Sequence, residues 1–156
     1  MRSVLLVEDN ALVSSTISEA FSLSGVALTH AADGPAALVA LESSRHDLAL
    51  IDVGLPGLSG IDVAKRAVEL EVPAVLMTGY GDVLAKADGL LFPVLSKPFR
   101  VRELVLRLEE VCAEAARLNR IMREQMMRGA ELIAEARDPH RPFSETWLRI
   151  CDRLML

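Results

Sequence analysis

The sequence has few aromatic residues, two cysteines and no long hydrophobic run. Aromatic residues make up 4% of the 156 positions, with one tryptophan and one tyrosine. No apolar stretch approaches the roughly 20 residues that a membrane-spanning helix needs. The first residues, Met1 to Val4, also lack the pattern of a cleaved signal peptide. We therefore expect a cytoplasmic protein without a membrane partner.

Cysteine and histidine are too sparse for a metal site built on sulfur or imidazole. Cys112 and Cys151 lack CxxC or histidine spacing, which favours two reduced thiols that only pack. His30, His46 and His140 are scattered along the chain, and we expect them in structural or solvent-facing positions.

Composition indicates a folded protein whose two parts differ in charge. Hydrophobic residues make up 51% and charged residues 25% of the sequence, which is typical of a globular domain. Residues 1–99 carry 12 acidic and 6 basic residues, whereas residues 100–156 carry 10 acidic residues and 11 arginines. The acidic part suits a cation site. The interleaved charges of the second part argue against a nucleic-acid surface.

Apolar runs and amphipathic stretches alternate five times in the first hundred residues. We expect strands at residues 4–7, 26–31, 47–52, 73–77 and around 94, and helices at residues 10–24, 34–43, 59–69 and 79–87. Continuous apolar runs are typical of buried parallel strands. The sequence therefore predicts an α/β fold, a flavodoxin-like doubly wound parallel sheet of five strands in the order 2-1-3-4-5.

Polar side chains follow four of these strands directly. Glu8 and Asp9 follow the first strand, Asp52 the third, Thr78 the fourth and Lys97 the fifth. Parallel strands bring their carboxyl ends to one edge of the sheet, where such folds bind ligands. Carboxylate oxygens suit Mg²⁺, and a carboxylate can accept a phosphoryl group as an acyl phosphate. The sequence predicts a site for a divalent cation and a phosphoryl group.

The motifs around these residues resemble the receiver domain of bacterial two-component response regulators. The similar segments are Glu8-Asp9, Asp52-Val-Gly-Leu-Pro-Gly-Leu-Ser-Gly60, Met77-Thr78-Gly79 and Lys97-Pro98-Phe99. The resemblance covers residues 1 to about 115. It implies that Asp52 receives a phosphoryl group from a histidine kinase or a histidine phosphotransfer protein.

The resemblance also implies roles for the surrounding residues. Glu8, Asp9, Asp52 and the main-chain carbonyl of Gly54 would hold Mg²⁺. Thr78 and Lys97 would contact the phosphoryl oxygens, and the Lys97–Pro98 peptide bond would be cis. The family fold does not imply an enzyme in the usual sense, beyond accepting the group and dephosphorylating itself.

The chain departs from the family pattern near the fifth strand. Family members often carry Tyr or Phe three residues before the lysine, where this chain has Val94. Phe92 or Tyr80 would have to replace that ring. The segment between Thr78 and Lys97 is short, which is similar to the compact receivers of hybrid histidine kinases.

From Arg100 onward the pattern predicts one long helix, a break at residues 138–142 and a further short helix capped by Ser144. Mostly apolar residues recur at heptad spacing along the long helix, with weak members at Gln125 and Gly129: Leu104, Leu108, Val111, Ala115, Leu118, Met122, Gln125, Gly129, Leu132 and Ala136. We divide the chain into a receiver domain, residues 1–117, and a helical extension, residues 118–156. The exposed apolar stripe of the extension predicts a homodimer or a protein partner.

Three functions compete. The first is a phosphorylation-dependent signalling receiver, and the second is a phosphorylation-independent scaffold that works through its C-terminal helices. A hydrolase of the phosphoaspartyl class is disfavoured, because such enzymes need a second aspartate two residues after the nucleophile, where this chain has Gly54. Binding of nucleic acid by the arginine-bearing part is not expected.

Overall fold

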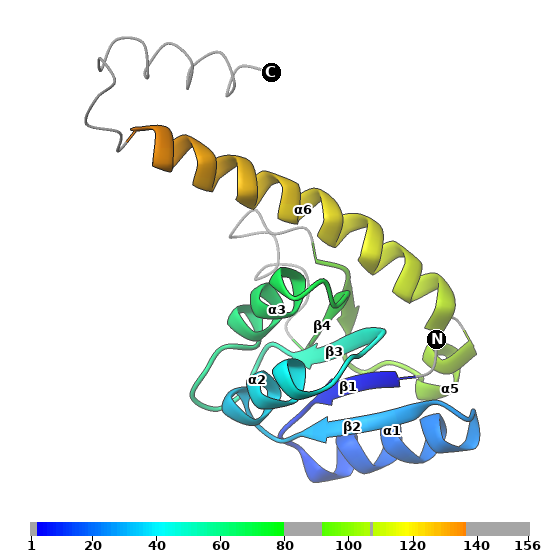
Figure 1. The fold of residues 1–156 in the computed structure, drawn as a ribbon. Coiled ribbons are helices and arrows are strands. Elements are labelled where there is room, and N and C mark those ends of the chain that lie inside the picture. The colour runs from blue at the N-terminus through cyan, green and yellow to red at the C-terminus, as the bar shows by residue number, and fades with distance from the viewer. Residues whose placement is uncertain (1–2, 80–91, 107, 137–156) are drawn as a thin grey trace. The chain divides into compact units, whose positions relative to one another are not determined.

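The computed structural model describes residues 3–79, 92–106 and 108–136. Within them, five strands form one parallel sheet in the order β2-β1-β3-β4-β5 (Figure 1). The strands are β1 Ser3–Val7, β2 Ala27–Ala31, β3 Leu48–Asp52, β4 Ala74–Thr78 and β5 Val94–Ser96. The predicted fold class and strand order are confirmed.

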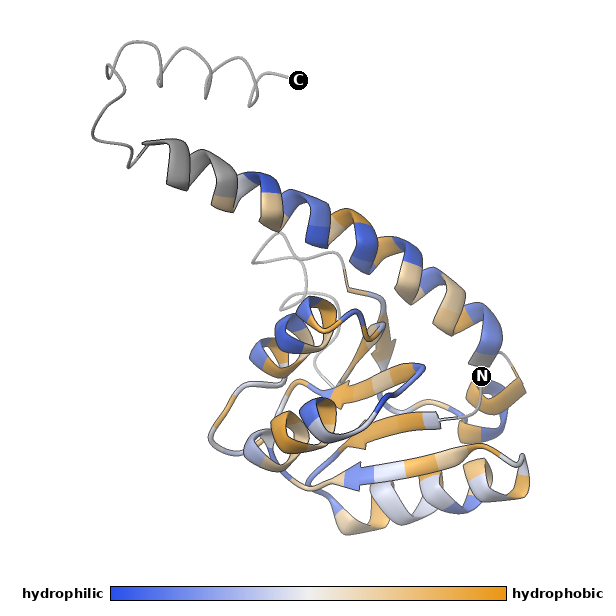
Figure 2. Ribbon diagram, in the orientation of Figure 1, coloured by the Kyte–Doolittle hydropathy of each residue, from blue (hydrophilic) through white to orange (hydrophobic). Residues whose placement is uncertain are grey.

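The central strands are buried, which explains why their sequences are continuous apolar runs. Residues 4–7 of β1, 48–51 of β3 and 74–77 of β4 have no exposed surface. Figure 2 shows this concentration of apolar residues in the middle of the sheet. Edge strand β2 differs, because only its last residue, Ala31, is buried. Burial of the central runs provides the main driving force for folding.

Capping side chains fix where the first three helices begin. The helices are α1 Ala11–Leu23, α2 Gly34–Ser43 and α3 Gly60–Glu69. Asn10, Asp33 and Ser59 precede them, and their side-chain oxygens accept hydrogen bonds from amides of the first turn. Helices α2 and α3 pack together on one face of the sheet, and α1 packs with α5, Val101–Leu106, on the other (Figure 1).

Helix α1 buries only a narrow face, although apolar residues lie on several of its sides. Ile17 and Phe21 are fully buried, but Leu12 and Leu23 are 76% and 84% exposed. At 3.6 residues per turn, Leu12 and Leu23 lie about 140° and about 120° around the helix from Ile17. Their side chains therefore remain on the solvent side.

Helix α6 spans Leu108–Ala136, and its first part is hydrogen-bonded to the amino ends of β3 and β4. Ala115 is fully buried in the core. The Cys112 thiol donates to the carbonyl oxygen of Asp47 at 3.2 Å, just before β3. The side-chain oxygen of Asn119 accepts a hydrogen bond from the first amide of β4, that of Ala74, at 2.6 Å. This part of α6 therefore belongs to the packed domain.

The chain divides into two compact units, residues 1–121 and 122–156. The predicted boundary after residue 117 stays a prediction. In the second unit, the described residues form the last turns of α6, where Met127 is 57% exposed. None of the described helices combines the length and the apolar character that a membrane crossing requires.

Some predictions fall outside the described residues. They concern most of the helix expected at 79–87, with Tyr80, and the final helix that Ser144 would cap. The helix expected from Arg100 onward corresponds to α5 and α6, and residue 107 between them is also outside the described part.

Candidate functional site

Strand register brings the predicted site residues to one edge of the sheet. Val7 of β1 pairs with Ile51 of β3, so Glu8 and Asp52 leave adjacent strands at the same level. Thr78 of β4 pairs with Ser96 of β5, and Lys97 follows directly. At this edge the chain leaves β1 toward α1 on one face of the sheet and leaves β3 toward α3 on the other. The crevice between two such strands is where these sheets usually bind ligands.

Lys97 joins two carboxylates of this edge. Its Nζ atom lies 2.6 Å from Glu8 Oε2 and 2.6 Å from Asp52 Oδ2. Glu8 is 1% exposed and the Lys97 side chain 22% exposed, so water screens these ion pairs little. Burial alone would lower the pKa of Lys97, but the hydrogen bonds to Asp52 and Glu8 outweigh it and raise that pKa. Lys97 is therefore a cation at neutral pH.

Three carboxylates converge beside Lys97. One oxygen each of Glu8, Asp9 and Asp52 lies within 4.8 Å of the others. Glu8 is buried, Asp52 is partly exposed and Asp9 is exposed. Mg²⁺ prefers oxygen ligands and keeps several waters. This set of oxygen donors, open to water at Asp9, fits that cation.

Two glycines after β3 contact Asp52 through the main chain, and one of them, Gly60, leaves no room for a side chain. The amide of Gly54 donates to Asp52 Oδ1 at 3.0 Å, which orients the carboxylate. A Cβ atom on Gly60 would lie 1.9 Å from the carbonyl oxygen of Asp52, so no larger residue fits without movement of the backbone. The role of the Gly54 carbonyl as a metal ligand stays a prediction.

Strands β4 and β5 place the remaining two site residues. Thr78 is buried at the end of β4, and its carbonyl oxygen accepts a hydrogen bond from the Lys97 amide at 2.7 Å. The Lys97–Pro98 peptide bond is cis, as the resemblance to receiver domains implied. The contacts of Thr78 and Lys97 with a phosphoryl group stay predictions.

Sequence reasoning missed one residue of this edge, His30. Its Nε2 atom lies 2.8 Å from the carbonyl oxygen of Glu8. His30 is the penultimate residue of β2, and its strand partner in β1 is Leu6. The predicted strand order already placed β2 beside β1, so the adjacency could have been inferred, although the hydrogen bond could not.

Comparison with known proteins agrees with this geometry. The response regulator receiver domain family matches residues 4–109. The sensory transduction protein RegX3 of Mycolicibacterium smegmatis is 34% identical over 120 residues, which cover 74% of this chain and 53% of RegX3. The response regulator receiver protein CpdR of Brucella abortus is 32% identical over 120 residues, which cover 74% of this chain and 100% of CpdR. The chain thus spans about half the length of RegX3 but matches CpdR over its full length.

Solved structures show the same fold. The receiver domain of the sensor histidine kinase PA1611 from Pseudomonas aeruginosa, with a magnesium ion coordinated in its active site cleft, is 27% identical with a TM-score of 0.64. The match covers 72% of this chain and 98% of that one. A CheY-like receiver domain protein from Methanospirillum hungatei gives a TM-score of 0.67 at 22% identity, over 75% of this chain and 98% of the other, and supports the fold alone.

The family match spans well over half of the chain, and relatives above 30% identity accompany it. The sheet order and the convergence of acids and lysine at its carboxyl edge agree with that match. This chain belongs to the receiver domains of two-component response regulators.

Proposed function

We propose that the protein accepts a phosphoryl group on Asp52 from a histidine kinase or a histidine phosphotransfer protein. The observation that carries the proposal is the position of Lys97, whose ammonium group lies 2.6 Å from Asp52 Oδ2 and 2.6 Å from Glu8 Oε2. A cation held beside a partly exposed carboxylate is suited to stabilise charge on an incoming phosphoryl group.

In the proposed transfer, an Asp52 carboxylate oxygen forms a bond to phosphorus while the bond between phosphorus and the donor imidazole nitrogen breaks. The electron pair of the broken bond stays on that nitrogen, and the product is an acyl phosphate. Thr78 donates its hydroxyl hydrogen, and Lys97 its ammonium hydrogens, to the phosphoryl oxygens. Positioning and charge neutralisation account for most catalysis of such transfers. Later attack by water would return Asp52 to its free form.

Glu8, Asp9, Asp52 and the Gly54 carbonyl would hold Mg²⁺ in this proposal. When bound there, Mg²⁺ would supply positive charge that offsets the negative charge of the transferring phosphoryl group. Lys97 holds Glu8 and Asp52 together when the ion is absent, because it forms ion pairs with both carboxylates.

The surface beside Lys97 suits a protein donor. An open hollow of about 500 Å³ lies there, lined mainly by apolar side chains, among them Leu12, Val13, Ile17, Pro98 and Phe99. Leu12 is 76% exposed on helix α1. Exposed apolar surface of this kind marks protein contacts. Leu12→Glu is expected to slow phosphorylation by a donor protein and to leave phosphorylation by acetyl phosphate unchanged.

The test of the phosphoacceptor role uses acetyl phosphate and Mg²⁺, with mass spectrometry of the intact chain. The wild type should gain the mass of one phosphoryl group. Asp52→Ala should gain none, whereas Asp62→Ala, which changes an exposed aspartate in the first turn of α3, should behave as the wild type. Phosphorylation that persists in Asp52→Ala would refute the proposal.

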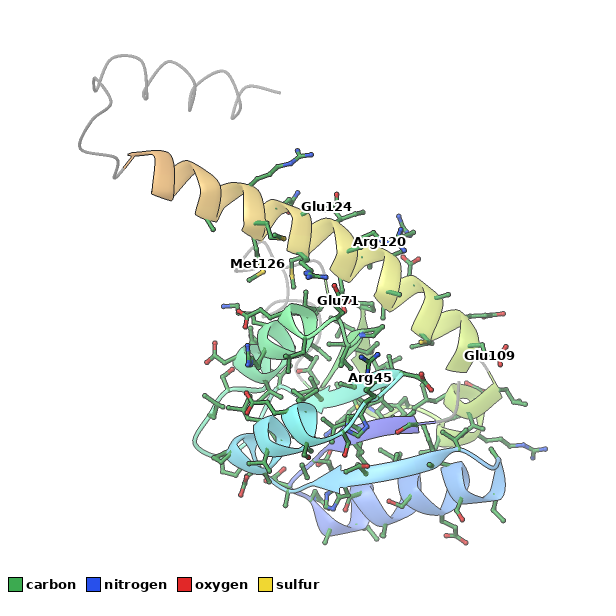
Figure 3. The ribbon with its side chains drawn as sticks, in the orientation of Figure 1. Arg45, Glu71, Glu109, Arg120, Glu124 and Met126 are labelled. Atoms are coloured by element: carbon green, nitrogen blue, oxygen red, sulfur yellow. The ribbon has the colours of Figure 1, made fainter. Side chains whose placement is uncertain are left out.

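For the output, the C-terminal helical region from residue 118 would dimerise or bind a protein partner. Arg120, Glu124 and Met126 lie along α6 in Figure 3, and Met126 and Met127 are exposed on this helix. Light scattering should give a dimer for the full chain and a monomer for Met126→Glu, because Met126 lies beside the heptad seam at Met122 and Gly129 and is 38% exposed. Leu23→Glu, an exposed leucine on α1, serves as the control. A monomeric wild type would exclude dimerisation as the form of output.

Val94 favours a second candidate, the phosphorylation-independent scaffold. The residue is a partly exposed valine on edge strand β5, at the position where family members often carry Tyr or Phe. The resemblance implies that this aromatic ring turns inward when the threonine follows the phosphoryl group, and valine cannot supply that response. Val94 also lines an open hollow of about 570 Å³ next to α5 and α6. If phosphorylation of Asp52 leaves the oligomeric state and partner affinity unchanged, the scaffold is the better account.

A further inference from the structure

The backbone between β1 and α1 is held by hydrogen bonds at all four polar groups of Glu8. Its amide donates to the carbonyl oxygen of Ala31 at 3.1 Å. Its Oε1 accepts from the amide of Asn10 at 3.2 Å, and its Oε2 accepts from Lys97 at 2.6 Å. The last polar group, the Glu8 carbonyl, accepts from His30 Nε2 at 2.8 Å.

The hydrogen bond from His30 controls an orientation that the other contacts leave open. The Glu8 carbonyl belongs to the peptide unit that joins Glu8 to Asp9, and this unit is planar. The Asp9 Cα atom lies in the same plane, so a hydrogen bond that fixes the carbonyl oxygen also fixes the position of this Cα atom. On the other side of Asp9, the Asn10 amide is bound to Glu8 Oε1. Asp9 is thus held at both of its peptide bonds.

Asp9 needs this control more than the other two acids. The carboxylate of Glu8 is fixed by Lys97 and the Asn10 amide, and that of Asp52 by Lys97 and the Gly54 amide. Asp9 is exposed, yet one of its oxygens lies within 4.8 Å of those of Glu8 and Asp52. Its direction therefore depends mainly on the backbone that carries it.

We propose that His30 is a positioning residue of the cation site. It touches no ligand atom, and it aims the Asp9 carboxylate by holding the peptide plane between Glu8 and Asp9. The inference rests on the proposed function, because it assumes that Glu8, Asp9 and Asp52 bind Mg²⁺. Residues that orient metal ligands in this way commonly change metal affinity by about 10-fold to about 100-fold when removed.

The test compares His30→Ala with His30→Gln in the full chain, by calorimetric titration with Mg²⁺ alone. The amide nitrogen of glutamine can take the place of imidazole Nε2 as the donor. We expect His30→Ala to weaken Mg²⁺ binding about 10-fold and His30→Gln to recover most of the affinity. Thr29→Ala, an exposed neighbour on the same edge strand, should bind Mg²⁺ as the wild type does.

Unfolding by urea without Mg²⁺ provides the second measurement. Because His30 is exposed, its loss should leave the urea midpoint near that of Thr29→Ala, so that a lower Mg²⁺ affinity reports on positioning and not on folding. Wild-type affinity in His30→Ala, or equal weakening in both His30 variants, would overturn the positioning role while leaving the proposed function intact. A wild type that does not bind Mg²⁺ would instead refute the proposed metal site, and with it the basis of this inference.

Discussion

The ammonium nitrogen of Lys97 lies 2.6 Å from a carboxylate oxygen of Glu8, although 89 residues separate the two in the sequence. Glu8 is 1% exposed, so its charge is almost fully removed from water. A buried charge is tolerated when it is paired, and removal of one partner leaves the other uncompensated. In the absence of a divalent cation, Lys97 therefore stabilises the same carboxylates that would bind one.

Lys97→Met should destabilise the metal-free protein. Breaking a buried ion pair costs about 3–5 kcal/mol, and we expect about 3 kcal/mol because Lys97 retains some contact with water. The free energy of unfolding, measured by urea titration with circular dichroism, checks this. Mg²⁺ should recover part of the loss in Lys97→Met, since it would compensate the same carboxylates.

Lys65→Met is the matched control for that substitution. Lys65 pairs with Asp62 at 3.9 Å, and both side chains are well exposed. Exposed pairs of this kind contribute about 0–1 kcal/mol, so the control should change the free energy of unfolding little. Similar losses in the two variants would contradict the role given to Lys97.

The contribution of Lys97 should disappear at alkaline pH. The pKa of Lys97 in the folded protein is raised above the ordinary value of 10.5. Well below pH 10.5, Lys97 is protonated in both the folded and the unfolded state, so its contribution is complete. As the pH rises through the folded pKa, the ammonium group loses its proton and the contribution is lost. The difference in free energy of unfolding between wild type and Lys97→Met should be constant from pH 7 to about pH 9.5 and then shrink. A constant difference up to about pH 11.5 would show that the charge of Lys97 is not what stabilises the site.

The same glycine-to-alanine change should have opposite effects at two positions. A Cβ atom on Gly60 would lie 1.9 Å from the Asp52 carbonyl oxygen, so Gly60→Ala should cost about 3 kcal/mol or more and disturb the site. Gly129 lies inside α6, where a Cβ atom would meet nothing within 4 Å, and Gly129→Ala should stabilise by about 0.5–1 kcal/mol. Thermal unfolding of both variants measures the two effects. Stabilisation by Gly60→Ala would mean that the turn after β3 is looser than its geometry indicates.

Most of the fold could be predicted because its signals are local. Buried parallel strands read as continuous apolar runs, and the caps at Asn10, Asp33 and Ser59 stand next to the helices that they begin. The convergence of Glu8, Asp52 and Lys97 followed from the strand order, because each residue comes directly after a strand.

The remaining features depend on contacts between distant residues. Asn119 binds the amide of Ala74 across 45 residues, and His30 binds the carbonyl of Glu8 across 22 residues. A single side-chain hydrogen bond produces no periodic pattern, so neither contact leaves a signal in the sequence. The exposure of Leu12 shows the converse, since an apolar residue in a helix does not reveal by itself whether its face is covered.

Asn119→Ala tests whether the first part of α6 is an integral part of the receiver fold. The substitution removes the acceptor of the buried Ala74 amide, and an unsatisfied buried donor costs about 1–3 kcal/mol. Helix propensity predicts the opposite sign, because alanine is a better helix former than asparagine by about 0.5 kcal/mol. The sign of the change in the free energy of unfolding therefore shows whether the hydrogen bond from Ala74 to Asn119 or the helix propensity of residue 119 contributes more to stability. Arg120→Ala, at the exposed neighbouring position, should change it by less than about 0.5 kcal/mol. A stabilised Asn119→Ala would show that the hydrogen bond to Ala74 does not anchor α6, and a destabilised one would extend the cooperative unit beyond residue 109, where the family match ends.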